Sequence, residues 1–147
     1  MYKSISRKRK SLLPVLVMLL FTAFYSSLNA QISVVVSSSS NHKASDTEIK
    51  NIFTGNLTAW PDGAKITVVD QPDNETGKTF YESFIGIAVS QVRVKWTKLV
   101  LSGAVMAPKK LNNDNEVKAE VSKDVNAVGF ISSASLDNSV KEIYRVK

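Results

Sequence analysis

The stretch KITVVDQPDNETGKTFYESF, Lys65 to Phe84, changes character twice, from a β-branched run to a polar turn and then to an amphipathic segment. A strand, a loop and a helix in this order are the setting of the GxxxxGK[ST] loop that holds nucleotide phosphates, and Gly77-Lys78-Thr79 matches its end. The first glycine of that motif is missing, because its position is Pro72, which fixes φ and has no N–H to donate. The stretch therefore predicts a strand–turn–helix unit without a nucleotide-binding loop.

Three other β-branched or alternating runs flank this unit. ISVVVS begins at Ile32 and AVGFIS at Ala127. ISVVVS resembles KITVVD in being a nearly continuous apolar run, as expected for a strand covered on both faces. EIYRV, near the carboxyl terminus, alternates between apolar and polar residues. It is therefore expected to form an edge strand.

Helical patterns separate these runs. Ser45 and Glu48 have the spacing of a capping box, and Gly55 is the expected stop of the helix that they start. Further helices are expected around Phe80 with a stop at Gly86, from Ser90, and after a second cap formed by Asn113 and Glu116. The inward-facing positions expected for the last two helices are Val92, Trp96, Leu99, Val100, Val117, Val121 and Val125.

Strands that alternate with helices predict an α/β fold. We expect a single three-layer domain over residues 31–147, in which a mainly parallel sheet of about four to five strands is flanked by helices. The sequence shows no internal repeat and no linker that would separate a second domain.

The first thirty residues read as an export signal. Five basic residues lie between Lys3 and Lys10, an apolar stretch runs from Leu12 to Phe24, and small residues lead to Ala30, where cleavage is expected. The apolar stretch is shorter than the about 20 residues of a spanning helix. We expect contact with the membrane only through this cleaved segment, with a retained anchor as the alternative.

Removal of this segment changes the charge of the protein. The whole chain carries a net charge of +6, but the remaining residues contain 14 basic and 13 acidic side chains, a net charge of +1. The basic character thus belongs to the export signal, and a nucleic-acid partner is not expected. Because the chain has no cysteine, it has neither a disulfide framework nor a lipid-attachment site.

Polar residues at two places are candidates for ligand contact. Ser37 and Ser38 follow the first strand and form either a solvated loop or a hydroxyl-rich rim at the carboxyl end of a strand, where ligands of open α/β sheets bind. Asn74, Thr76 and Thr79 open the helix after KITVVD. They are either helix caps or ligand contacts.

No catalytic or cofactor motif accompanies these candidates. The single histidine, His42, has no neighbouring Cys or His to complete a metal site, and there is no GxSxG nucleophile elbow. NNDNE, Asn112 to Glu116, resembles a calcium loop, but the sixth position is Val117 where that loop needs glycine. We therefore expect no enzyme activity, no cofactor and no metal.

Four segments resemble, in order, the phosphate-type periplasmic solute-binding proteins of ABC transporters. They are EIKNIFTGNLTAWPDGAKITVV from Glu48, YESFIG from Tyr81, KWTKLVLSGAVMAP from Lys95 and NNDNEVKAEVSKDVNAVGFISSASL from Asn112, within residues 32–140. Members of that family have two α/β lobes with an oxyanion in the cleft between them. The resemblance implies a periplasmic, single-lobe short form that begins at the crossing strand, Ile32 to Ser37.

The ligand motif of that family, Arg followed by three residues and Ser-Gly-Thr, is only partly retained. With Phe80 aligned on the Phe of the family, Thr76 keeps the threonine, Asn74 replaces Ser, Glu75 replaces Gly and Asp70 replaces Arg. Asp70 and Glu75 would then place negative charge where the family holds a dianion. The resemblance therefore predicts weak or absent binding of phosphate.

Three hypotheses follow for function. The first is an exported relative of the solute-binding proteins that binds a small oxyanion such as phosphate and serves an ABC permease. The second is a periplasmic accessory or protein-interaction module that has lost the ligand and binds another envelope protein. The third is a homodimer that forms a cleft between two copies.

Overall fold

The computed structural model describes residues 31–147, and the expected signal peptide, residues 1–30, lies outside the described residues. Within the described part, no helix is both long and apolar enough to cross a membrane.

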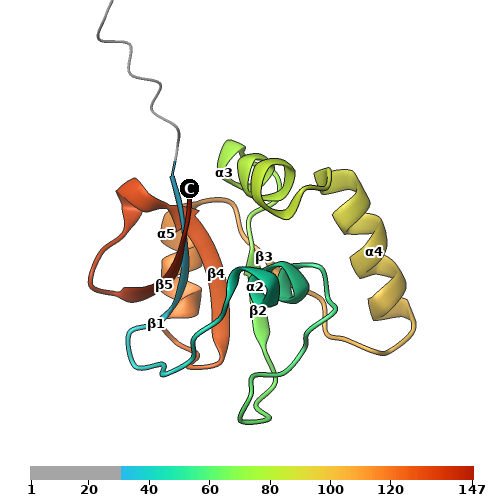
Figure 1. The fold of residues 1–147 in the computed structure, drawn as a ribbon, viewed down its shortest axis with the longest axis horizontal. Coiled ribbons are helices and arrows are strands. Elements are labelled where there is room, and N and C mark those ends of the chain that lie inside the picture. Colours follow the sequence, from blue (N-terminus) through green and yellow to red (C-terminus); the bar gives the residue numbers. More distant parts are fainter. Residues whose placement is uncertain (1–30) are drawn as a thin grey trace, which may run out of the picture.

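The described residues form one five-stranded sheet in the order β3-β2-β4-β1-β5 (Figure 1). Its strands are β1 (Ile32–Ser37), β2 (Thr67–Asp70), β3 (Lys109–Lys110), β4 (Ala127–Ser132) and β5 (Val140–Val146). β2 is parallel to β3 and β4, whereas β1 is antiparallel to β4 and β5. The expected α/β class is confirmed, with β5 at an edge; the sheet is mixed because β1 runs against the other four strands.

Helical segments connect the strands. They are α2 (Asp46–Phe53), α3 (Glu75–Thr79), the π-helical turn η2 (Phe80–Ile85), α4 (Val89–Leu101), α5 (Asp114–Val121) and the 3₁₀ turn η3 (Ser133–Ser135). The capping box of Ser45 and Glu48 is confirmed, and Gly55 and Gly86 follow their helices with positive φ. α4 begins one residue before Ser90, after Ala88, whose side chain makes no cap.

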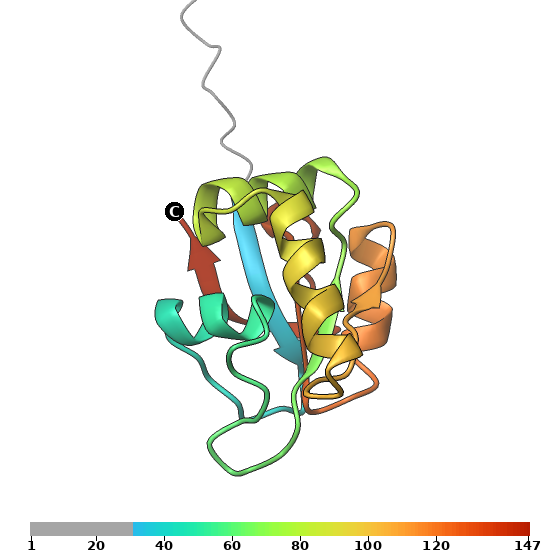
Figure 2. The ribbon, with the colours of Figure 1, turned by 90° about the vertical axis from the view of Figure 1, so that its right-hand side faces the viewer.

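Each face of the sheet has its own core. On one face, Val34, Val36 and Phe130 pack against α2, η2 and α4; on the other, Val35 and Ile131 pack against α5 (Figures 1 and 2). The Phe80 ring stacks on the Phe130 ring, with centroids 4.0 Å apart. Strand periodicity thus gives three layers, helices–sheet–helix, as expected.

Two residues predicted to face inward are exposed. Val100 is in the last turn of α4, and Val125 lies in the turn between α5 and β4. Val92 and Trp96 do reach the core, and Val117 and Val121 are fully buried. The prediction failed at Val100 and Val125 because each comes where its helix is ending or has ended, beyond the surface that the sheet covers.

Gly129 sets the spacing between β4 and α5. A Cβ at this position would lie 2.8 Å from Val117 Cγ1 and 3.1 Å from Val121 Cγ2. We expect Gly129→Ala to push α5 away from the sheet and lower the free energy of unfolding by about 1–3 kcal/mol, measured by urea denaturation. The double variant with Val117→Ala should recover part of this loss, and equal losses in the single and double variants would contradict the close contact.

Candidate functional site

The end of β2 directs neighbouring side chains to opposite faces of the sheet. Val69 belongs to the core beneath α5, and Gln71 contacts Asp114 at the start of α5. Asp70 lies on the other face, near Tyr81 of η2. The strand–turn–helix unit predicted from the sequence therefore has polar groups on two separate sides.

Asn74 caps α3. Its Oδ1 accepts a hydrogen bond from Gly77 N at 2.9 Å, and its Nδ2 donates to Gln71 Oε1 at 2.7 Å and to Asn112 O at 3.0 Å. The capping interpretation of Asn74 is thus confirmed, and the amide hydrogens of its side chain are committed to protein acceptors.

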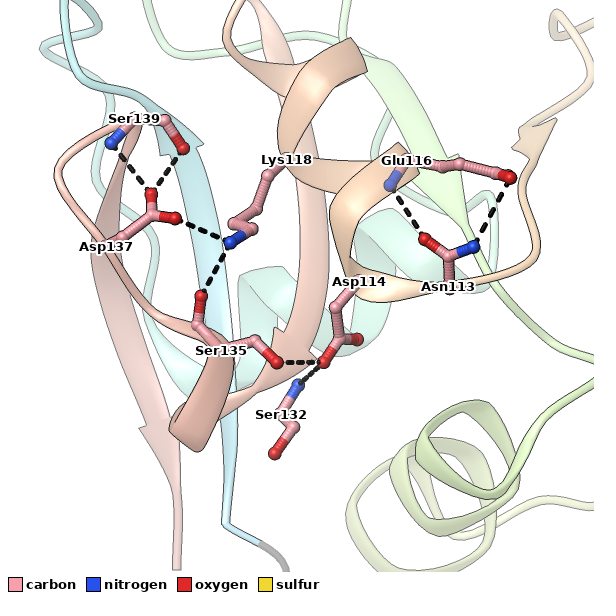
Figure 3. Close-up of polar contacts among 8 residues, drawn as sticks. All are labelled: Asn113, Asp114, Glu116, Lys118, Ser132, Ser135, Asp137 and Ser139. Atoms are coloured by element: carbon pink, nitrogen blue, oxygen red, sulfur yellow. Dashed lines mark hydrogen bonds and ion pairs between the residues drawn. The ribbon is translucent and has the colours of Figure 1, made fainter.

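Gln71 and Asp114 continue this set of hydrogen bonds. Gln71 Nε2 donates to Asp114 Oδ1 and to Phe130 O, both at 2.8 Å. Asp114 Oδ2 accepts from Ser132 N at 3.2 Å and from Ser135 Oγ at 2.6 Å (Figure 3). We call Asn74, Gln71, Asp114 and Ser135 the polar chain; it ties α3, α5 and η3 together.

One ion pair and neighbouring hydrogen bonds hold η3 and the loop after it. Lys118 Nζ donates to Ser135 O at 2.9 Å and to Asp137 Oδ2 at 2.6 Å, while Asp137 Oδ1 accepts two hydrogen bonds from Ser139 (Figure 3). The hydrogen bond from Lys118 and, to a smaller extent, those from Ser139 hold the pKa of Asp137 well below its usual range. Lys118, the lysine of α5, therefore holds the segment from Ser135 to Asp137 in place.

A hollow of about 410 Å³ lies between the amino-terminal ends of α3 and α5. No lysine or arginine of the described residues lines it, and two of its lining residues, Glu75 and Asp114, carry carboxylates. The lining residues are Gln71, Asn74, Glu75, Thr76, Asn112, Asn113, Asp114, Asn115 and Ser135. We call it the polar hollow; an anion there would meet two negative charges and no cation.

The five candidate ligand residues do not lie together. Asn74 and Thr76 line the polar hollow, but Thr79, at the end of α3, does not. Ser37 and Ser38 are at the opposite end of the sheet, because β1 is antiparallel to β4 and its last residues lie beside the first residues of β4. A rim that combines these serines with Asn74 and Thr76 is excluded by the direction of β1.

Asp70 also differs from expectation. It does not line the polar hollow; instead it lines a second pocket, on the α4 face, and is only 3% exposed. Burial raises the pKa of its carboxyl to about 6. Hydrogen bonds from the Tyr81 side chain and the Gln71 backbone, and the positive charges of Lys110 and Arg93, lower this pKa by less. The sequence predicts that Asp70 and Glu75 carry the negative charge at the oxyanion position. In the polar hollow that charge comes from Glu75 and Asp114 instead.

The other residues considered from the sequence have structural contacts. His42 stacks on Trp60, with ring centroids 4.3 Å apart, and its Nε2 is 3.1 Å from Asn126 Oδ1. Both tryptophans lie in the core, where Trp60 Nε1 donates to Asn126 O and Trp96 Nε1 to Phe53 O. Residues 31–147 contain no cluster of three or more His, Cys, Asp or Glu that could hold a metal ion.

Gln71 and Ser135 were missed as site residues by sequence reasoning, and Asp114 was considered only as part of a calcium-like segment. Gln71 meets Asp114 across 43 residues of sequence. The one local signal was the position of Gln71 directly after a buried strand, where side chains gather in open α/β sheets.

Solved structures of phosphate receptors share this fold. No family model and no curated protein matches the sequence. An ABC-type phosphate transport receptor from Vibrio cholerae matches with a TM-score of 0.59 and 22% identity, over 78% of this chain and 49% of the receptor. A protein assigned as a phosphate ABC transporter substrate-binding protein from Clostridium perfringens, solved with bound phosphate, matches with a TM-score of 0.61 and 22% identity, over 78% and 45%.

A third structure, PstS from Borrelia burgdorferi, matches with a TM-score of 0.57 and 12% identity, over 78% of this chain and 47% of that protein. The chain thus spans about half the length of each of these proteins. At these identities the similarity establishes the fold. The described residues have the fold of one lobe of a phosphate ABC transporter substrate-binding protein.

Proposed function

We propose that the chain is an exported, non-enzymatic lobe of the solute-binding type that has kept the fold of the phosphate receptors and lost their oxyanion chemistry. It then serves as an accessory module of the cell envelope, in contact with a permease or another envelope protein. The observation that carries this proposal is the polar hollow, where Glu75 and Asp114 lie at the helix ends and no lysine or arginine of residues 31–147 is among the lining residues.

Electrostatics weighs against phosphate in this hollow. A carboxylate about 5 Å from a phosphate charge costs about 3 kcal/mol at an effective dielectric constant near 20. A micromolar ligand has a total binding free energy of about 8 kcal/mol. Two such carboxylates would therefore consume most of the binding energy of a phosphate ligand.

The binding part of the proposal predicts no saturable binding of inorganic phosphate. Isothermal titration of the purified full chain at pH 7.5 with up to about 1 mM phosphate should give only heat of dilution. A dissociation constant below about 100 μM (about 5.5 kcal/mol) would overturn the loss of oxyanion chemistry. Glu75→Gln serves as the matched variant, because it removes one of the two carboxylates without changing the size of the side chain.

A small oxyanion ligand is the second candidate function. It is favoured by the position of Thr76 and the start of α3 in a fold whose Clostridium perfringens neighbour was solved with bound phosphate. This candidate requires that the wild-type chain bind phosphate and that Glu75→Gln bind it more tightly. The same titrations therefore separate the two functions.

Export is supported by the basic, apolar and small-residue order of residues 1–30. Cell fractionation should place the protein in the periplasm, with mass spectrometry giving a first residue of Gln31. A full-length protein in the membrane fraction would favour the retained anchor. Cross-linking in intact cells then distinguishes a permease, another envelope protein and a second copy of the chain as partners.

A further inference from the structure

Exposed apolar side chains are concentrated on α4 and the loop that follows it. Of the large apolar side chains that are exposed in residues 31–147, all but Val125 lie between residues 94 and 106; they are Val94, Val100, Leu101 and Met106. Leu101 and Met106 are 82% and 83% exposed, so both project into solvent and pack on little of the protein. The apolar surface is therefore local, at the carboxyl-terminal end of α4.

The periodicity of α4 places part of this surface on one outward stripe. Val94, Lys98 and Leu101 occupy positions i, i+4 and i+7, which share one face of a helix. Val92 and Trp96 point the other way, into the core. α4 is the outermost helix on its side of the sheet and lies in front of the sheet in Figure 2. The stripe thus faces away from the body of the protein.

The same segment is the basic pole of the protein. Residues 83–113 contain five basic side chains and no Asp or Glu, a net charge of +5. The other residues between 31 and 147 contain 9 basic and 13 acidic side chains, a net charge of −4. The small net charge of residues 31–147 therefore conceals a strong separation of charge, which favours an anionic partner at α4.

Most of these basic side chains are available to such a partner. Arg93 forms an ion pair with Asp73, and Lys109 forms one with Glu120. The other three form no ion pair with residues 31–147; they are Lys95, Lys98 and Lys110. Lys110 and Leu101 line the same pocket beside α4, so a lysine of β3 lies close to the apolar end of the helix.

The composition of this surface favours a lipid bilayer over a protein as the partner. Protein interfaces are enriched in aromatic residues and arginine and depleted in lysine. Here four of the five basic side chains are lysines. The one aromatic side chain of residues 89–110, Trp96, is only 7% exposed. Lysines beside projecting apolar side chains are typical of segments that lie on anionic membranes.

We propose that the outward face of α4 and the loop after it bind the surface of an anionic phospholipid bilayer. Leu101 and Met106 enter the boundary between headgroups and acyl chains, and Lys98 and Lys110 contact lipid phosphates. We call Val94, Lys98, Leu101, Met106 and Lys110 the basic patch. This inference goes beyond the proposed function, which concerns protein partners, and beyond the membrane contact predicted for residues 1–30.

A single fluorescent label tests which side of the protein meets the lipid. Because the chain has no cysteine, Met106→Cys gives one labelling position in the basic patch, and Lys123→Cys gives a control at the end of α5, on the other side of the sheet. We expect a nitrobenzoxadiazole label at position 106 of the full chain to brighten at least twofold and shift to the blue with phosphatidylcholine vesicles that contain phosphatidylglycerol.

The label at position 123 should not respond, and vesicles of phosphatidylcholine alone should change neither label. Residues 1–30 are present in both labelled chains, so a contact of that segment with lipid does not distinguish them. No response at position 106, or an equal response at both positions, would overturn the proposal. Soluble polyglutamate that gives the same response as the vesicles would overturn it in favour of an acidic polypeptide.

Two substitutions, read through the label at position 106, test the charge and the apolar contact. Lys98→Glu should raise the lipid concentration at half-maximal response at least tenfold, whereas Lys123→Glu, with the same change of charge, should raise it less than threefold. Leu101→Gln should raise it at least fivefold, and Val125→Gln should leave it unchanged. Circular dichroism should report a folded chain in each variant. Equal effects of Lys98→Glu and Lys123→Glu, or no effect of Leu101→Gln, would contradict the basic patch as the binding surface.

Discussion

Replacing Gly77 with alanine is expected to lower the free energy of unfolding by about 3 kcal/mol, although helix propensity alone favours alanine by about 1 kcal/mol. A Cβ at this position would lie 2.0 Å from Gln71 O, 2.8 Å from Pro72 Cα and 2.9 Å from Gln71 C. All three atoms belong to the backbone, so no side-chain rotation relieves the clash. Urea denaturation of the wild-type protein and the variant measures the difference.

Lys78 provides the control for this prediction. It is the next residue of the same helix and is exposed. Lys78→Ala should therefore change the free energy of unfolding by no more than about 0.5 kcal/mol. A Gly77→Ala variant more stable than the wild type would contradict the close packing of α3 on the loop that follows β2. The glycine that resembles part of a phosphate loop is thus required by packing.

Replacing Asp70 with asparagine is expected to stabilise the protein at neutral pH by about 3 kcal/mol. Burial raises the pKa of this carboxyl from 3.8 in the unfolded chain to about 6 in the folded one. Between these values the folded state binds more protons than the unfolded state, so stability falls as pH rises. This difference in pKa corresponds to a loss of about 3 kcal/mol in the free energy of unfolding at neutral pH. Asparagine avoids this loss because its amide carries no charge.

The pH dependence makes this prediction specific. Urea denaturation at pH 7.5 should show the full gain from Asp70→Asn. At pH 3.5 little of the gain should remain, because the carboxyl is protonated in the folded state and mostly protonated in the unfolded chain. Glu75→Gln should show no comparable gain at either pH. A loss of stability in Asp70→Asn at pH 7.5 would mean that the ionised carboxylate is paired in the folded protein, for example with Lys110.

Local patterns were sufficient to predict most of the secondary structure. The β-branched runs became β1, β2 and β4, and Ser45, Asn74 and Asn113 cap the helices that follow them. β3 was missed because its two residues are exposed lysines and carry no apolar pattern. A strand that is held only by backbone pairing leaves no signal in side-chain periodicity.

The residues of a strand do not by themselves determine its direction in the sheet. The run from Ile32 predicts a buried strand equally well in either direction, and pairing with β4 and β5 decides it. This is why the sequence could not indicate that Ser37 and Ser38 lie at the opposite end of the sheet from Asn74 and Thr76. Tertiary pairing also explains why Gln71, whose partner Asp114 is distant in sequence, was not predicted.

The alternation of side chains along β2 explains why Asp70 was predicted at the ligand position but lies on the other face of the sheet. The family motif places this position at the ligand, but in this chain the aspartate turns toward Tyr81 and an apolar pocket. The sequence correctly indicated an acidic residue at the end of the strand. It could not indicate toward which face of the sheet the side chain points. A shift of one position along a strand moves a side chain to the opposite face, and here the two faces carry two separate sites.

The position of β1 has a consequence for the order in which the protein can fold. β1 is the first element of the described chain, yet both of its neighbours, β4 and β5, lie between residues 127 and 146. Its hydrogen bonds therefore close loops of about one hundred residues. Contacts this distant form late and slow the folding of a chain. While the protein is being synthesised, the centre of its sheet stays incomplete until the last residues arrive.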